Sequence, residues 1–141
     1  MMKKHYYFYG SLIGLIIAAI TAYSIMGHTF TNMISSFSNF KGGFIPITAG
    51  AWTALIIARW CDKTVQSKNV IYKGIIIPVF IFSVGVITGS LLNLMNSVPH
   101  QSFQANFIDF FFKPVYWLGL IGLPSAIIVG LTHYLVNANK N

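Results

Sequence analysis

Few side chains in this 141-residue chain could take part in acid–base chemistry or bind a metal ion. It contains four histidines, two acidic residues and one cysteine. His28, His100 and Asp109 fall in polar connections between apolar stretches and could in principle share a site. No zinc-ligand spacing, such as two histidines four residues apart, accompanies them. We therefore predict no catalytic residue, no metal and no cofactor, and an enzyme built on these three residues is a minor alternative.

The other reactive groups lie close together in the polar stretch 59–73, which carries four of the nine basic residues and one of the two acids. A single cysteine cannot form an intrachain disulfide, so we expect Cys61 to act as a small, inert apolar residue. Arg59 and Asp62 are expected to form an exposed ion pair or to contact lipid headgroups. An exposed pair contributes less than about 1 kcal/mol.

The composition is that of a membrane protein. Apolar residues make up 55% of the chain and charged residues only 8%, with a mean hydropathy of +0.69. Soluble domains carry about 25% charged residues, so a soluble fold of this size would lack the charge to cover its surface. The net charge of +7 is spread over tails and turns, and we predict no nucleic-acid partner.

Four apolar stretches are candidate membrane spans, at residues 6–26, 44–60, 74–95 and 115–136. A helix of 21 residues covers about 31 Å, close to the thickness of a bilayer core. The sequence thus predicts one domain, 1–141, that is an all-α integral membrane protein: an antiparallel bundle of four transmembrane helices. A cleaved signal peptide is the alternative for the first stretch.

Two polar connections contain phenylalanines at helical spacing. This spacing favours two short amphipathic helices in the interface, each with its apolar side in the bilayer. The phenylalanines predicted to lie there are Phe30, Phe37 and Phe40 in the first connection, and Phe103, Phe107 and Phe110 in the third.

The distribution of basic residues predicts the orientation. Seven of the nine lie in the two tails and the central turn, whereas Lys41 and Lys113 are alone in the other two connections. Cytoplasmic loops are enriched in Lys and Arg, so we expect both termini and the central turn in the cytoplasm. Met1 followed by Lys3 and Lys4 is typical of direct insertion into a bacterial inner membrane.

Each predicted span contains small residues four positions apart. Residues at this spacing share one helix face and let two helix backbones approach closely, which is a main source of helix association in lipid. The small residues predicted to form packing or partner interfaces are Gly10, Gly14, Gly50, Ala54, Gly85, Gly89, Gly122, Ala126 and Gly130. We expect most of them to pack within the bundle, with Gly85 and Gly89 the best candidates for contacting a partner. We call each such series of small residues a ladder. The ladders also suggest that the chain consists of two related hairpins, residues 1–62 and 63–141.

The predicted function is therefore that of an accessory or binding protein without catalysis. It would pack against the bilayer and another membrane protein or a second copy of itself. One version is an immunity protein that blocks a membrane-active toxin. The alternative is a small oligomeric transporter, channel or flippase. No charged residue falls inside the predicted spans, which disfavours ion-coupled exporters and voltage sensors.

Overall fold

The computed structural model describes residues 5–28, 44–65, 69–96 and 102–138, and all of its regular elements are helical. The prediction of an all-helical chain is confirmed for these residues. The elements are α1 (Tyr6–Met26), α4 (Ile45–Thr64), the π-helical turn η3 (Tyr72–Ile76), α5 (Ile77–Asn96), α6 (Phe103–Phe107), the π-helical turn η4 (Ile108–Phe112) and α7 (Lys113–Ala138).

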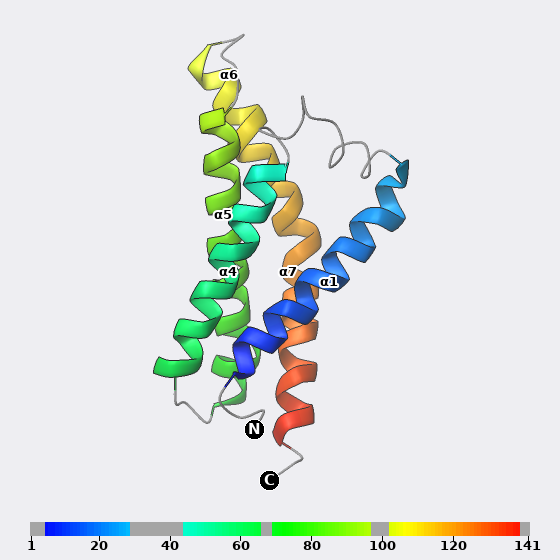
Figure 1. Cartoon of the computed structure of the whole chain (residues 1–141), viewed down its shortest axis with the longest axis vertical. Helices are drawn as coiled ribbons and strands as arrows, with labels where there is room; N and C mark the ends of the chain where they lie inside the picture. The colour runs from blue at the N-terminus through cyan, green and yellow to red at the C-terminus, as the bar shows by residue number, and fades with distance from the viewer. Residues whose placement is uncertain (1–4, 29–43, 66–68, 97–101, 139–141) are drawn as a thin grey trace.

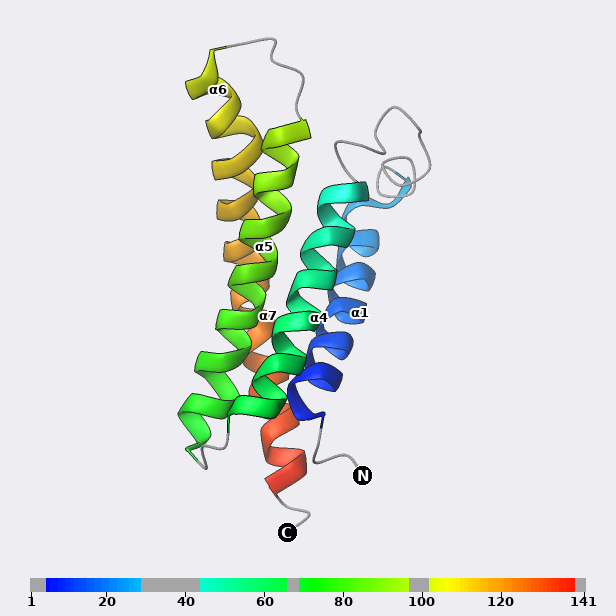
Figure 2. The ribbon, with the colours of Figure 1, turned by 60° about the vertical axis from the view of Figure 1, so that its left-hand side comes forward.

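Helix α5 lies between α4 and α7, and α1 crosses the bundle obliquely (Figures 1 and 2). Helix α1 begins, α4 ends, η3 begins and α7 ends at one end of the molecule. Arg59, Lys63 and Lys73 belong to this end, which we call the basic end. The opposite end, where α5 ends and α6 begins, is called the far end.

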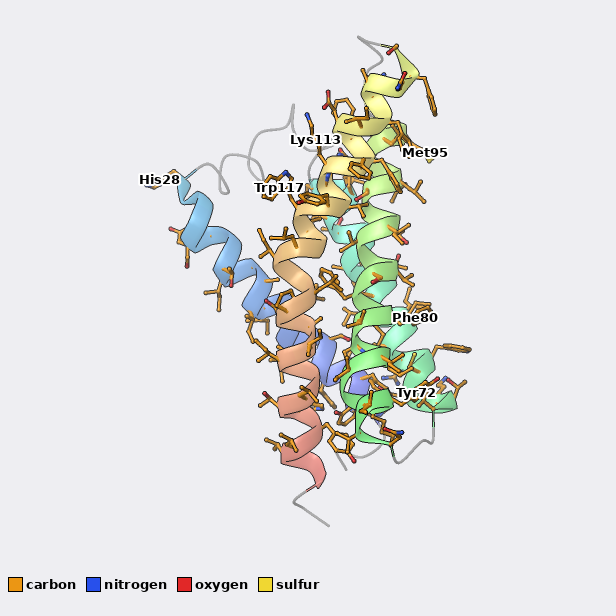
Figure 3. The ribbon with its side chains drawn as sticks, turned by 180° about the vertical axis from the view of Figure 1, so that it is seen from behind. His28, Tyr72, Phe80, Met95, Lys113 and Trp117 are labelled. Carbon is orange, nitrogen blue, oxygen red and sulfur yellow. The ribbon has the colours of Figure 1, made fainter. Side chains whose placement is uncertain are left out.

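Two helical stretches, Tyr72–Asn96 and Phe103–Val136, are long and apolar enough to cross a membrane. The part of α1 from Tyr6 to Thr21 is a shorter apolar stretch. Many of their large apolar side chains lie on the surface. Phe80, Met95 and Trp117, for example, project outward from the bundle (Figure 3). Isolated exposed apolar residues are normal in a soluble protein, whereas whole helices covered with them are not.

Both π-helical turns end two residues before a proline, at Pro78 and Pro114. A proline inside a helix lacks an N–H group, and its ring conflicts with the carbonyl four residues earlier. A wider turn relieves this conflict and leaves that carbonyl free. In η4 the carbonyl is that of Phe110, and it accepts a hydrogen bond of 3.1 Å from the side-chain amide of Asn93. The hydrogen bond from Asn93 thus connects the end of α5 to η4, and Pro114 makes the Phe110 carbonyl available for it.

The third connection differs from the prediction. The helix expected to lie separately in the interface, with Phe103, Phe107 and Phe110, instead runs without a break through η4 into α7. Two features explain this continuity. The π turn accommodates Pro114, and the rings of Phe107 and Phe111 stack along the helix with centroids 4.9 Å apart. The other predicted interfacial helix, with Phe30, Phe37 and Phe40, lies outside the described residues.

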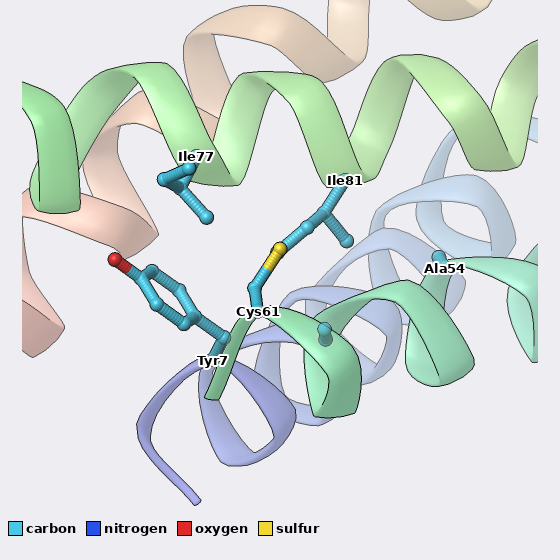
Figure 4. Packing of buried hydrophobic residues seen from close by; sticks show 6 residues of the cluster. Tyr7, Ala54, Cys61, Ile77 and Ile81 are labelled. Atoms are coloured by element: carbon cyan, nitrogen blue, oxygen red, sulfur yellow. The ribbon is translucent and has the colours of Figure 1, made fainter. Parts of the chain in front are cut away.

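The buried core is small (Figure 4), and Tyr7, Cys61 and Ile77 place it toward the basic end. It consists of Tyr7, Ala54, Ala58, Cys61, Ile77 and Ile81. The Cys61 side chain is 1% exposed, and burial, followed by the nearby Asp62 carboxylate, raises the pKa of its thiol. A thiol that stays protonated is a poor nucleophile, so Cys61 serves as packing.

The ion pair between Lys113 and Asp109 should contribute little to stability. Its N–O distance is 2.6 Å, but the two side chains are 61% and 40% exposed. We expect Asp109→Asn to change the free energy of unfolding in detergent by less than about 0.5 kcal/mol, as for other exposed i,i+4 pairs. Lys113→Gln should behave in the same way in denaturant titrations. A loss above about 1 kcal/mol in both variants would show that this pair does more than the structure indicates.

Candidate functional site

A half-open apolar cleft of about 330 Å³ lies between α1 and α7. Ile81 and Phe82 of α5 and Ala54 of α4 lie behind it. Small residues four positions apart line its two walls: Gly10, Gly14 and Ala18 on α1, and Gly122, Ala126 and Gly130 on α7.

The cleft is lined mainly by apolar side chains and is open on one side. Covering apolar surface stabilises a protein by about 25 cal/mol per Å². The lining is therefore favourably covered by apolar groups, either from outside the chain or from the cleft walls themselves.

Asp62 holds the start of α1, next to the cleft residues Tyr6 and Tyr7. Its carboxylate, at the end of α4, accepts hydrogen bonds from the backbone N–H of Tyr7 at 2.6 Å and of Phe8 at 3.1 Å. The first N–H groups of a helix have no partner within the helix, and a carboxylate also complements the positive end of the helix dipole. Asp62 thus serves as an N-cap supplied from 55 residues away along the chain.

Two opposing influences act on the pKa of Asp62. Burial raises it, and the hydrogen bonds from the Tyr7 and Phe8 backbone lower it, as do the charges of His5 and Arg59. Burial prevails, so the pKa is raised above its ordinary value. The expected Arg59–Asp62 ion pair is not what the structure shows. Instead, the Arg59 guanidinium lies over the Phe8 ring, 5.7 Å from its centroid, in a cation–π contact.

Tyr6 and His133 connect α1 to α7 at the basic end of the cleft. The Tyr6 hydroxyl donates to the carbonyl oxygen of Gly130 at 3.3 Å, and the Tyr6 and His133 rings lie 4.4 Å apart. A β-carbon placed on Gly10 would lie 3.5 Å from the His133 ring, which is ordinary contact distance. Together with Asp62, these contacts fix one end of α1.

The predicted small residues of α4 and α5 contact one another directly. A β-carbon placed on Gly50 would lie 2.7 Å from the Gly85 carbonyl oxygen, and one on Gly85 would lie 2.9 Å from that of Gly50. A β-carbon on Gly89 would lie 2.8 Å from the carbonyl oxygen of Pro46. The two backbones are thus close along the whole contact. Gly85 and Gly89, which we expected to be the best candidates for a partner, face α4 of the same chain.

Two of the α7 glycines also face other elements of the bundle. Gly122 lies against the ring of Phe82, and Gly130 lies against the Gly74 carbonyl and the Pro78 ring. Gly14 is the exception among the predicted ladder glycines, all of which the structure describes. A β-carbon placed on Gly14 would have no atom of the described residues within 4 Å, although Gly14 lines the cleft.

The polar residues considered for chemistry are not assembled into a site within the described part of the chain. His28 is exposed at the far end of α1, Asp109 is paired with Lys113, and His100 lies outside the described residues. Among residues 5–28, 44–65, 69–96 and 102–138, no three His, Cys, Asp or Glu side chains are grouped so that they could hold a metal ion.

Sequence reasoning missed the residues that hold α1: Tyr6, Asp62 and His133. Each is separated from its partner by more than 50 residues, so no local spacing signals the contact. One signal was present in the sequence. Asp62 is an acidic residue at the end of the second predicted span, and that end is predicted to lie beside the start of the first span, where a carboxylate can accept hydrogen bonds from free N–H groups.

Comparison with known proteins adds no relative, because no protein family, curated protein or solved structure matches this chain. The fold and the cleft define the class of protein. The described residues form a helical bundle with two stretches long and apolar enough to cross a membrane, and a half-open apolar cleft lies between two of its helices.

Proposed function

We propose that this chain is a small binding protein of the bacterial inner membrane. It crosses the bilayer four times with its basic end in the cytoplasm. Without catalysis of its own, it receives a transmembrane helix of another membrane protein in the cleft between α1 and α7. Function thus lies in intramembrane helix packing.

Two observations support the membrane part of this proposal. The outer faces of α1, α4, α5 and α7 carry exposed large apolar side chains along most of their length, which suits a lipid environment. Helix α4 ends with Arg59 and Lys63, and η3 carries Lys73, at the same end of the molecule. That clustering agrees with the excess of basic residues in cytoplasmic loops.

The proposed binding of a partner helix rests on the open space at Gly14. At Gly50, Gly85 and Gly130, by contrast, a backbone carbonyl of another element lies directly against the glycine. Glycine in a helix interior costs about 1 kcal/mol relative to alanine, so an unused one is a disadvantage to the free protein. A helix entering the cleft would gain close backbone contact at Gly14, which is how small residues promote association in lipid.

Immunity against a membrane-active toxin is one form that this function would take. The inserted helix of the toxin would then occupy the cleft, and its packing against Gly14 and Ala18 would hold it in an inactive arrangement. Alternatively, this chain would act as an accessory subunit of a larger membrane assembly and hold one helix of that assembly in the cleft. A transporter or flippase remains the alternative, since a half-open apolar cleft also admits a lipid chain.

Site-specific photo-crosslinking in cells tests the occupant. We expect a benzophenone amino acid at Ile121, which lines the cleft, to cross-link to a protein with its own membrane-spanning segment. Gly14→Leu should reduce this product at least tenfold, because the leucine fills the space the partner helix needs. Gly119→Leu is the matched control: its β-carbon also meets nothing within 4 Å, but the residue does not line the cleft.

The product must depend on the cleft to count as support. A cross-link that survives Gly14→Leu, or one of equal yield from the exposed position Ile56 on α4, contradicts the proposal. Lipid adducts alone at Ile121 would favour the flippase alternative, and a product of twice the 15.7 kDa chain mass would identify a second copy as the occupant.

A further inference from the structure

The start of α1 is held more firmly than the rest of the helix. Its first turn is tied to α4 through Asp62 and to α7 through the Tyr6 hydroxyl, and Tyr7 is 4% exposed in the core. The Arg59 contact with Phe8 adds a fourth attachment. All of these contacts fall within three consecutive residues, Tyr6 to Phe8.

Within the described residues, α1 is held less firmly beyond Gly10. None of its side chains described from Ser11 onward is buried, and Ile16 and Ile20 are among the exposed large apolar residues. The hydroxyls of Thr21 and Ser24 donate to the carbonyls of Ile17 and Ile20 in the same helix. They need no partner on another helix, since they are satisfied locally. Figures 1 and 3 show α1 leaving the bundle as it approaches the far end.

We propose that α1 is a hinged arm that turns about Tyr6, Tyr7 and Phe8 and opens or closes the cleft against α7. A rigid helix held at one end and bordered by an unfilled apolar space has two ways to remove that space. It admits an occupant, or it swings shut. The inference concerns the free protein, so it stands or falls independently of the proposed binding of a partner helix.

The two cleft walls have matching spacing for closure. The ladder on α1 steps by four residues through Gly10, Gly14 and Ala18, and α7 steps by four through Gly122, Ala126 and Gly130. The helices run in opposite directions, and each step of four residues rises about 6 Å on both. Closure that sets Ala18 against Ala126 therefore brings Gly14 level with Gly130. Small residues on both walls permit close backbone approach, while larger cleft residues such as Leu15 and Ile121 would have to move aside.

Distances between spin labels in a lipid bilayer test the hinge. The outer pair is Thr21→Cys with Leu118→Cys, both lining the cleft away from the hinge. The control pair is Tyr9→Cys with Leu135→Cys, both exposed and close to the held end. The native Cys61 is 1% exposed, and the chain without added cysteines gives its background labelling.

We expect the outer pair to show two distances, with a minor population of up to about 10%, while the control pair shows one narrow distance. Gly14→Leu should prop the cleft open, remove the shorter distance of the outer pair and leave the control pair unchanged. Ala18→Leu, at an exposed position, should do the same if Gly14→Leu does not fold. Gly119→Leu should change neither pair.

One narrow distance for the outer pair, unaffected by Gly14→Leu and Ala18→Leu, would overturn the hinge. The proposed function would survive that result, because a fixed cleft can still receive a helix. Conversely, two distances in pure protein would support the hinge even if no partner cross-links in cells.

Discussion

Gly85→Leu should prevent α4 and α5 from packing and leave little folded protein. A β-carbon on Gly85 would already lie 2.9 Å from the Gly50 carbonyl oxygen and 3.0 Å from the β-carbon of Ala54. Leucine adds three further carbons in a place where the neighbour is backbone, which cannot rotate away. Overpacking of a core usually costs about 1–3 kcal/mol, and we expect at least the upper value here. The measurements are the yield of monodisperse protein in detergent and its thermal unfolding.

A graded series makes this prediction specific. Gly50→Ala adds one carbon, 2.7 Å from the Gly85 carbonyl oxygen, and should lower the free energy of unfolding by about 1–3 kcal/mol. Gly119→Leu adds the same side chain as Gly85→Leu to a helix with open space around it, and should be tolerated. Equal unfolding temperatures for Gly85→Leu and Gly119→Leu would contradict the close backbone contact between α4 and α5.

The helices were largely predictable because their signal is local. Long uncharged stretches indicated the first, third and fourth helices, and the predicted range 6–26 coincides with α1. The predicted bounds were less accurate where charge and proline intervene. Helix α4 continues four residues beyond the predicted position 60, through Cys61 and Asp62, because those residues pack against α1 and α5 instead of ending the helix. The π turn before Pro114 likewise lets α6 join α7.

The pairing of small-residue ladders was not predictable, because four-residue spacing identifies a face but not its neighbour. Gly85 and Gly14 look alike in sequence, each the start of a glycine or alanine step in an apolar helix. The first is in backbone contact with α4, and the second faces open space. What distinguishes them is the oblique course of α1, which depends on the contacts of Tyr6 and Asp62 with residues far away in sequence.

Asp62→Ala should loosen the attachment of α1 to the bundle, because it leaves the N–H groups of Tyr7 and Phe8 without their acceptor. Loss of a helix cap costs about 0.5–2 kcal/mol. The carboxylate is only partly buried, so we expect a loss of about 1–2 kcal/mol in the free energy of unfolding. Asp62→Asn should cost less, because its amide oxygen still accepts one of the two bonds. Equal stability of the alanine variant and the parent would show that Asp62 does not hold α1.

The same residue should give the protein a pH response with a defined sign. Burial raises the pKa of Asp62 above the value of 3.8 expected in the unfolded chain, so the folded protein binds this proton more tightly. Tighter binding to the folded state adds stability that is fully present below pH 3.8 and is lost as the pH rises through the folded pKa. The parent protein should therefore gain stability relative to Asp62→Asn as the pH is lowered from 7 toward 4, in parallel denaturant titrations. Asp109 is present in both chains and cancels. A relative loss on acidification would mean that the two backbone hydrogen bonds outweigh burial, and that the charged carboxylate is the form that holds α1 in place.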